Sequence, residues 1–266
     1  MCSIATGLAM SDPTRPCVLV TGGARRIGAA ISRRFAVAGW HVVVHYRSSE
    51  SAARDLVASL PSARAICFDL ADADAMHRAV DRLAAEMGDW RCLVNCAAIF
   101  ERDSVTGLDV PTYDRAMTVN ARAPVELAQA YLRQGRSASG RRVIQFTDQK
   151  LVNPNPDFFS YTMSKHAVDG AIPMLAMAQR DPRDRVYGLA PGAILPSHDQ
   201  SRAETEISHR LNLLGRKTGV EEVADAAFFL ATGPVRSGET IHVDSGQHLL
   251  RQERDVIYLA REGESR

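Results

Sequence analysis

The chain has 266 residues, with 32 Lys and Arg against 31 Asp and Glu, so its formal net charge is +1. This balance provides no overall field that would recruit a nucleic acid or a membrane surface. No apolar run reaches the roughly 18 residues that a membrane-spanning helix needs. We therefore expect one large cytoplasmic α/β domain with an ample core, without nucleic-acid or membrane partners.

The N-terminal residues and the cysteines fit this picture. Residues 1–15 lack the basic-then-apolar pattern of a signal peptide and are expected to form a disordered lead-in. The five cysteines are odd in number and form no C-x-x-C pair, which indicates packed thiols in a reducing compartment. No cluster of His, Cys and carboxylates has metal-ligand spacing, so no metal site is predicted.

The first predicted unit is strand, glycine-rich turn, helix and parallel strand. These elements are expected at residues 17–20, 21–28, 29–38 and 41–45. Gly22 and Gly28 would let the backbone approach a pyrophosphate at the helix N-terminus, where free N–H groups and the helix dipole favour an anion. The alternative is an ordinary βα turn that contains glycine.

The residues after the second strand indicate which dinucleotide binds. A site that selects NAD carries an acidic residue here, which binds the adenosine ribose. This chain has Tyr46, Arg47 and Ser48 instead. A guanidinium and a hydroxyl suit a 2′-phosphate, so the expected cofactor is NADPH/NADP. The alternative is a solvated Arg47 that begins the next helix.

Strands and helices continue to alternate to the end of the pattern. The remaining strands are expected at 64–68, 92–94, 142–147, 185–189 and 239–243, and the helices at 73–87, 113–133, 159–179 and 220–231. No repeat, linker or second domain interrupts them. The pattern predicts a single Rossmann-like doubly wound parallel sheet with helices on both faces.

Two further segments receive separate interpretations. Asp69 and Leu70 follow the third strand, where they could hold the adenine edge. Residues 196–218 are polar with little periodicity and look like a mobile lid, in which His198 and His209 could touch a substrate.

The candidate catalytic pair is Tyr161 and Lys165, four residues apart and therefore on one helix face. An ammonium close to a phenol lowers the pKa of the tyrosine from about 10, which makes it a usable proton donor. Such a pair can also arise by chance in any helix. Asp148 closes the apolar strand at 142–147, so it would lie at a strand's carboxyl end, where open parallel sheets bind ligands.

Together these motifs resemble the short-chain dehydrogenase/reductase family over residues 15–248. The matching motifs, in order, are the turn at 21–28, Asp69-Leu70, Asn95-x-Ala97, Asn120, Tyr161-x3-Lys165 and Pro191-Gly192. The resemblance implies that Tyr161 donates the proton, that Lys165 binds the nicotinamide ribose, and that Asn120 holds a water in the proton relay.

The same resemblance implies the rest of the cofactor site, the domain limits and the assembly. The cofactor-binding residues would be Gly22, Arg25, Arg26, Ile27, Gly28, Tyr46, Arg47, Ser48, Asp69, Leu70, Asn95, Ala97, Lys165, Pro191 and Gly192. The family domain would cover 16–250, followed by a tail at 251–266 that outlasts the usual family end and could cross a subunit boundary. The protein would be a homo-oligomer, a tetramer.

Three departures from the common pattern resemble one branch, the pteridine reductases with the bacterial dihydromonapterin reductases. They are Arg26 in place of glycine, Asp148 in place of serine thirteen residues before Tyr161, and an aromatic residue at Phe100. The branch implies substrate contacts by Arg26, Phe100, Asp148 and Tyr161. Ala98 departs from it, because a serine hydroxyl is usual there.

Electrostatics favours the same substrate class. An ionised Asp148 would repel the negative charge that develops on a ketone oxygen, by about 4 kcal/mol at 4 Å and an effective dielectric constant near 20. A C=N acceptor must instead gain a proton, and a carboxylate stabilises the cationic iminium. Phe100 offers a face to a flat ring or packs beneath the cofactor. Asp148 alternatively caps the strand end or pairs with Lys150.

These observations predict an NADPH-dependent reductase that converts a dihydropterin, similar to dihydromonapterin or dihydrobiopterin, into the tetrahydropterin. The first alternative is an NADP-dependent ketone or 3-oxoacyl reductase of the same family. The alternative from another class is a regulator that binds NADP(H) without turnover.

Overall fold

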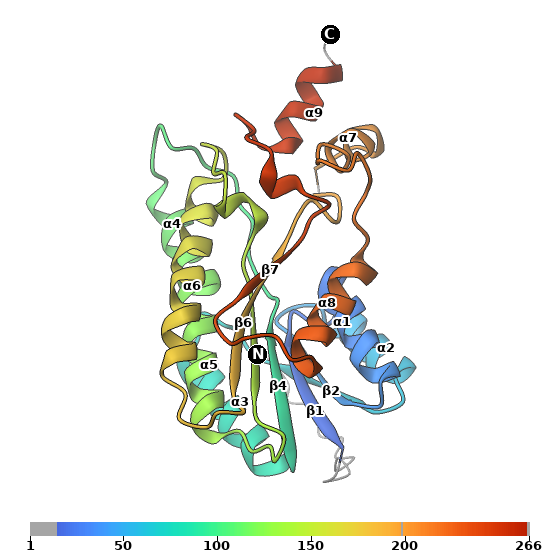
Figure 1. The fold of residues 1–266 in the computed structure, drawn as a ribbon, viewed down its shortest axis with the longest axis vertical. Helices are drawn as coiled ribbons and strands as arrows, with labels where there is room; N and C mark the ends of the chain where they lie inside the picture. The colour runs from blue at the N-terminus through green and yellow to red at the C-terminus, as the bar shows by residue number, and fades with distance from the viewer. Residues whose placement is uncertain (1–14, 198, 265–266) are drawn as a thin grey trace.

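The computed structural model describes residues 15–197 and 199–264. In this part of the chain, seven strands form one sheet in the order β3-β2-β1-β4-β5-β6-β7, and every neighbouring pair is parallel. The strands are β1 Pro16–Thr21, β2 His41–Tyr46, β3 Ala63–Cys67, β4 Asp89–Asn95, β5 Arg142–Phe146, β6 Arg185–Pro191 and β7 Thr240–Val243. The predicted doubly wound parallel sheet is confirmed (Figure 1).

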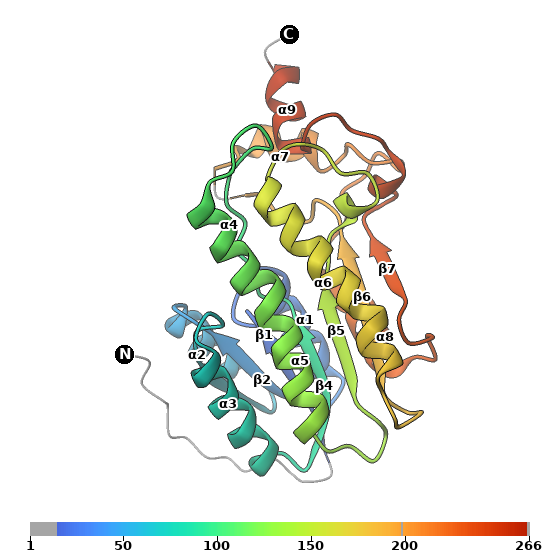
Figure 2. The same cartoon turned by 90° about the vertical axis from the view of Figure 1, so that its left-hand side faces the viewer.

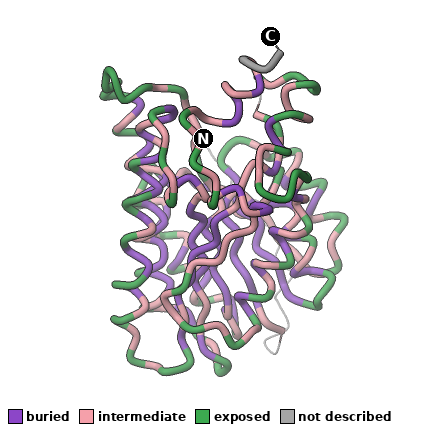
Figure 3. The backbone as a smooth tube through the Cα atoms, turned by 45° about the horizontal axis from the view of Figure 1, so that its top comes forward, coloured by how far each residue is buried: buried purple, intermediate pink, exposed green. Residues whose placement is uncertain are grey.

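Helices cover both faces of the sheet (Figures 1 and 2). One face carries α1 Arg26–Val37, α2 Glu50–Ser59 and α8 Val220–Thr232, and the other carries α3 Ala73–Glu86, α5 Ala123–Gln134 and α6 Phe159–Met177. The side chains of β1 alternate between the two cores: Val18 and Val20 pack into the first, and Cys17 and Leu19 pack into the second. A strand buried on both faces is apolar throughout, which is why these strands were evident from the sequence (Figure 3).

The long helix expected at 113–133 is interrupted. It consists of α4 Val110–Ala116, a π-helical segment η1 Met117–Arg122, and α5. Pro124 lies at the start of α5 and has no N–H to donate, which gives a local reason for the break in the α-helical hydrogen bonds. Asn120, one of the predicted catalytic residues, lies in the π-helical segment.

Two helices lie where none was expected, α7 Arg202–Ser208 and α9 Val256–Glu264. The predicted lid 196–218 therefore contains a helix. It begins with a capping box, in which Ser201 and Glu204 exchange side-chain and backbone hydrogen bonds. Seven residues are too few to show a helical period, so the sequence pattern missed it.

The predicted tail packs against its own chain above the carboxyl ends of the strands (Figure 1). Arg261 donates to Glu204 at 2.6 Å and pairs with Asp199 at 3.3 Å, which ties α9 to α7 and its flank. The residues of the expected lead-in up to 14, and His198, lie outside the described residues. None of the helices in 15–197 and 199–264 is long and apolar enough to cross a bilayer.

The strand order reverses between β1 and β4, where chain connections leave in opposite directions. Such a switch point opens a crevice at the carboxyl ends of the strands. The turn after β1 lines this crevice. Its residue Gly22 has a φ of +63°, which glycine adopts without strain. A Cβ on Gly28 would overlap the carbonyl oxygen of Gly22, so the backbone of the turn and the backbone of α1 are in direct contact.

This close packing gives a stability prediction. Gly28→Ala should lower the free energy of unfolding by about 1–3 kcal/mol, the usual effect of overpacking. Gly170→Ala is the matched control, because a Cβ at that position in α6 meets no atom within 4 Å. Replacing a helical glycine there should raise the stability by about 0.5–1 kcal/mol. Chemical denaturation of both variants measures the difference, and equal stabilities would contradict the packing argument.

Candidate active site

Two adjoining cavities lie at the switch point. The large cavity has a volume of about 440 Å³ and the small cavity about 220 Å³. Gly22, Arg25 and Ala97 line both of them. Of the predicted site residues, the large cavity also has Arg26, Ile27, Gly28, Phe100, Asp148, Tyr161, Lys165, Pro191 and Gly192 in its wall, and the small cavity has Tyr46, Arg47, Ser48, Asp69 and Leu70.

Two predicted residues, Asn95 and Asn120, are absent from the walls of both cavities as described. The Nδ2 of Asn95 donates to the carbonyl of Pro124 at 2.9 Å, which ties β4 to α5. The side chain of Asn120 exchanges two hydrogen bonds with the backbone of Ile99, at 2.8 and 2.9 Å. Both side chains therefore fix the backbone that surrounds the crevice.

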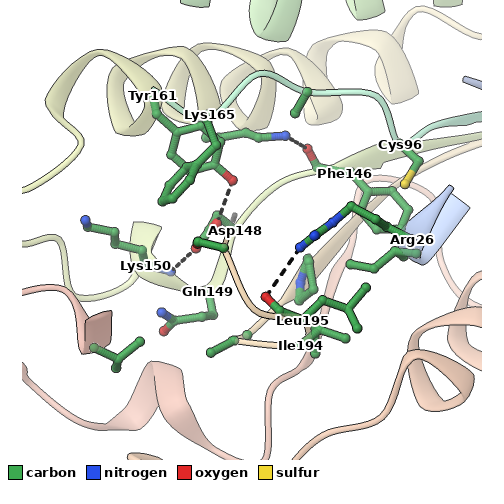
Figure 4. Close-up of a pocket in the computed structure, with 18 of the residues that line it drawn as sticks. Arg26, Cys96, Phe146, Asp148, Gln149, Lys150, Tyr161, Lys165, Ile194 and Leu195 are labelled. Carbon is green, nitrogen blue, oxygen red and sulfur yellow. Dashed lines mark hydrogen bonds between the residues drawn. The ribbon is translucent and has the colours of Figure 1, made fainter. Parts of the chain in front are cut away.

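The centre of the large cavity is a hydrogen bond between the two residues that the sequence singled out. The Tyr161 hydroxyl, at the start of α6, donates to Oδ2 of Asp148, just after β5, over 2.7 Å (Figure 4). Lys165 follows one turn later, and its Nζ donates to the carbonyl of Phe146 at 2.7 Å. The ammonium lies 5.6 Å from the centre of the Tyr161 ring.

The acidities differ from the expectation. Burial and the neighbouring Asp148 raise the pKa of Tyr161 well above 10, so the predicted lowering of this pKa by Lys165 is wrong for the free protein. The reason is geometric: the lysine is hydrogen-bonded to a backbone carbonyl, while a carboxylate occupies the position beside the phenol. Burial lowers the pKa of Lys165 to about 8. Burial also raises the pKa of Asp148.

Asp148 has two roles in the structure. One oxygen caps the short 3₁₀ helix η2 Gln149–Leu151 by accepting from the backbone N–H of Lys150 at 2.9 Å, and the other accepts from Tyr161. The Lys150 ammonium is directed elsewhere, to the carbonyl of Asp157 at 2.6 Å and to Asp255 at 3.3 Å. Asp148 therefore caps a turn after the strand, which was one of the alternatives considered for it, and it also contacts Tyr161. The alternative ion pair between Asp148 and Lys150 is not formed, because the Lys150 ammonium contacts Asp157 and Asp255.

Arg26 connects the glycine turn with the loop after β6. Its Nη2 donates to the carbonyls of Pro196 at 2.9 Å and Leu195 at 3.4 Å (Figure 4). Its backbone φ of +53° is unusual for a residue with a side chain. This conformation sets the direction in which the arginine leaves the turn at the mouth of the large cavity.

The family model that matches residues 22–248 is described as enoyl-(acyl carrier protein) reductase. The chain belongs to the short-chain dehydrogenase/reductase family. The match spans the glycine turn, both cavities and the last strand, so it covers every element of the site described above except the tail. The protein is accordingly an oxidoreductase of this family.

Relatives within this family differ in what their names state. Pteridine reductase 1 of Leishmania tarentolae is 26% identical, over 91% of this chain and 99% of its own length. The 3beta-hydroxysteroid dehydrogenase 1 of Eggerthella lenta is 29% identical, over 87% and 93%. Among solved structures, FolM alternative dihydrofolate reductase 1 of Brucella suis, in complex with NADP, is 34% identical with a TM-score of 0.82, and covers 90% of this chain and 97% of that one.

Two features of the site were not predicted from the sequence. The first is the side chain of His45. Its Nδ1 accepts from the N–H of Gly22 at 3.1 Å, and its Nε2 lies 3.0 Å from the carbonyl of Phe68. A neutral ring that accepts at Nδ1 and donates at Nε2 satisfies both contacts, and burial lowers the pKa of His45 to about 4. The histidine thus holds the glycine turn, a contact between distant residues that no local pattern announces.

The second is an aromatic stack that joins the tail to Tyr161. Phe100 lies edge-on to Tyr161 and stacks on Phe158 with ring centres 4.0 Å apart, and Tyr258 of α9 lies on the same Phe158. One face of Phe100, predicted to meet a flat substrate, is therefore covered by protein. The tail also contributes Asp255, Val256 and Ile257 to the cavity wall.

The contact between Tyr161 and Asp148 gives a titration prediction. The phenol hydrogen bond stabilises the ionised carboxylate, so Tyr161→Phe should raise the pKa of Asp148 further and keep it protonated to higher pH. Carbon-13 NMR of the carboxyl group, assigned with Asp148→Asn, measures the change. Tyr113→Phe, on α4, is the control and should leave the titration unchanged. An unshifted or lowered pKa in Tyr161→Phe would show that the hydrogen bond is absent in solution.

Proposed function

We propose that the protein is an NADPH-dependent reductase that converts a dihydropterin, similar to dihydromonapterin or dihydrobiopterin, into the tetrahydropterin. The observation that carries the proposal is the 2.7 Å hydrogen bond from Tyr161 to a carboxylate at the end of β5. A carboxylate there opposes the developing oxyanion of a ketone and favours an acceptor nitrogen that gains a proton. The similarity to a pteridine reductase and to an alternative dihydrofolate reductase supports a substrate with a reduced pteridine ring.

The residues present fit NADP. The backbone of the turn at Gly22 and Gly28 leaves the helix N-terminus of α1 at the cavity, where N–H groups favour a pyrophosphate. Arg47 is exposed at the small cavity and has no ion pair within the described residues, so its guanidinium is available for a 2′-phosphate. The Brucella suis FolM protein was crystallised with NADP. When bound, the reduced nicotinamide supplies the hydride for the C=N carbon.

The chain's own residues handle the proton. The Tyr161 hydroxyl is the donor to the substrate nitrogen, and Asp148 is the group behind it. In the free protein the Asp148 carboxylate accepts from the tyrosine hydroxyl, and it can relay a proton from solvent to the tyrosine oxygen as the tyrosine gives up its own. Lys165, buried beside them, binds the nicotinamide ribose and offsets negative charge on the pair. Tyr161 then need not persist as a phenolate, which its raised pKa disfavours.

We also propose a cytoplasmic homotetramer. Cys92 and Cys96 are free thiols whereas Cys67 is disulfide-bonded, so the cysteines by themselves do not favour a reducing compartment. On α6, Met163, Met174 and Met177 are exposed, and an apolar helix face of this kind suits contact with a second copy of the chain.

The choice of cofactor can be tested at Arg47. Arg47→Asp replaces a charge-assisted hydrogen bond to the 2′-phosphate with repulsion, while the new acid can accept from a free ribose hydroxyl. The ratio of kcat/KM for NADPH to that for NADH should collapse or invert. Arg136→Asp makes the same charge change at an exposed residue that lines neither cavity as described, and it should leave the ratio unchanged. An unchanged ratio in Arg47→Asp would transfer the selection to Ser48 or Arg25.

The substrate class can be tested at Asp148. NADPH oxidation by Asp148→Ser should fall by about 10²–10⁴-fold with dihydropterins, the usual range for general acid–base catalysis. Slight activity should appear with small ketones and 3-oxoacyl thioesters, because serine suits a carbonyl oxygen. Tyr161→Phe is the matched variant and should lose both reactions. A folded Asp148→Ser protein with full dihydropterin turnover would overturn the substrate assignment and leave the family unaffected. If the wild-type protein binds NADPH but turns over none of these substrates, the alternative of a non-catalytic NADP(H)-binding regulator is favoured.

A further inference from the structure

Part of the wall of the large cavity is formed by segments outside the nucleotide-binding pattern. We call it the outer wall, and it consists of Ser197, Gln200, Ser208, His209, Asp255, Val256 and Ile257. These residues come from the flanks of α7 and from the tail, which lie side by side above the sheet (Figures 1 and 2). The glycine turn and the catalytic pair lie on other elements. The outer wall therefore contacts whatever part of a substrate extends beyond the reacting atoms.

Most polar groups of the outer wall already have partners in the protein. The Gln200 amide accepts from the N–H of Ser197 at 2.9 Å and donates to Ser208 at 3.1 Å. Asp255 accepts from the N–H of Ile257 and pairs with Lys150. These groups hold the wall together, and their hydrogen-bonding capacity is largely used.

His209 is the exception. It is 4% exposed and lines the large cavity, yet neither ring nitrogen has a hydrogen-bond partner among the described residues. Its backbone is satisfied, since its N–H donates to Thr205 and its carbonyl accepts from Asn212. The ring nitrogens are not among the fully buried unpartnered atoms of the described residues, so they remain accessible from the cavity and can bind a group that enters it.

Gln149 contributes a second free group to the same cavity. It follows Asp148 directly, is half-buried, and its side-chain amide has no partner within the described part of the chain (Figure 4). An imidazole and an amide have in common that each both donates and accepts a hydrogen bond while uncharged. The side chains of His209 and Gln149 therefore offer a substituent neutral groups that both donate and accept.

We propose that His209 is a specificity-determining residue that hydrogen-bonds a hydroxyl group on the substituent of the reduced pterin ring. The inference rests on the proposed function and names the substrate class more closely: a dihydropterin with a hydroxylated side chain. A hydroxyl both donates and accepts, as a neutral imidazole does, so each satisfies the other inside the cavity.

Charge argues against a carboxylate in the same place. Burial lowers the pKa of His209, which keeps the ring neutral at physiological pH. The ammonium groups near this wall are already paired: Lys150 binds Asp255 and the carbonyl of Asp157, and Lys217 binds Glu206. At the outer wall a substituent with a free carboxylate would meet Asp255, whose own ammonium partner Lys150 is already used, whereas a polyhydroxylated chain needs no cation.

The test compares two substrates in two variants. Wild type, His209→Leu and His209→Asn are assayed with NADPH and either 7,8-dihydromonapterin, which carries a trihydroxypropyl chain, or 6-methyl-7,8-dihydropterin. In His209→Leu, kcat/KM should fall by about 10–100-fold for the hydroxylated substrate, as for loss of one buried hydrogen bond, mostly through KM. For the methyl substrate it should change by less than about 3-fold. His209→Asn keeps a donor and an acceptor and should retain part of the preference.

Controls separate this inference from folding and from the proposed function. His166→Leu changes an exposed histidine of α6 and should preserve both rates. NADPH binding and thermal unfolding show whether each variant is folded. If His209→Leu is not folded, the comparison of the two substrates in His209→Asn tests the inference. Equal losses with both substrates would overturn the role of His209 while the proposed function stands. Failure of wild type to reduce either dihydropterin would overturn the proposed function, and this inference with it.

Discussion

A carboxylate and a phenol joined by a hydrogen bond at the end of a buried strand are the feature on which the rest of the site depends. Asp148 and Tyr161 are both half-buried, and burial disfavours the charged form of each. The positive charges of Lys165 and Lys150 both favour the ionised form of Asp148, although burial lowers the pKa of Lys165 itself to about 8. Asp148, Tyr161 and Lys165 thus share one buried environment, which opposes the charged form of each.

The fold brings these groups together by geometry that is remote from their chemistry. β5 ends at Phe146, whose carbonyl accepts from Lys165, and Asp148 follows two residues later. Because β5 lies next to β4, and β4 next to β1, Asp148 and the glycine turn line the same cavity. The parallel sheet fixes the positions of these two groups relative to one another, and the loops above it form the rest of the cavity wall.

The sequence predicted the parts of the molecule that depend on periodicity. Strands buried on both faces are short apolar runs, and the glycine turn and the Tyr161–Lys165 spacing need only local geometry. It did not predict α7 or α9, because helices of seven and nine residues carry little periodic signal and are held by long-range pairs such as Arg261 with Glu204. The predicted lowering of the pKa of Tyr161 was wrong for a similar reason. Which group lies beside a phenol is a tertiary fact, and spacing alone suggested the lysine.

The contact between Lys150 and Asp255 has a consequence for how the molecule is assembled. These residues are 105 positions apart, so closing the wall around the tyrosine also closes a long loop of chain. Loop entropy rises only slowly with length, and the equilibrium penalty is modest. The kinetic effect is larger, because contacts between distant segments form after the local ones. The substrate pocket should therefore be among the last regions to become ordered during refolding, later than the sheet that supports it.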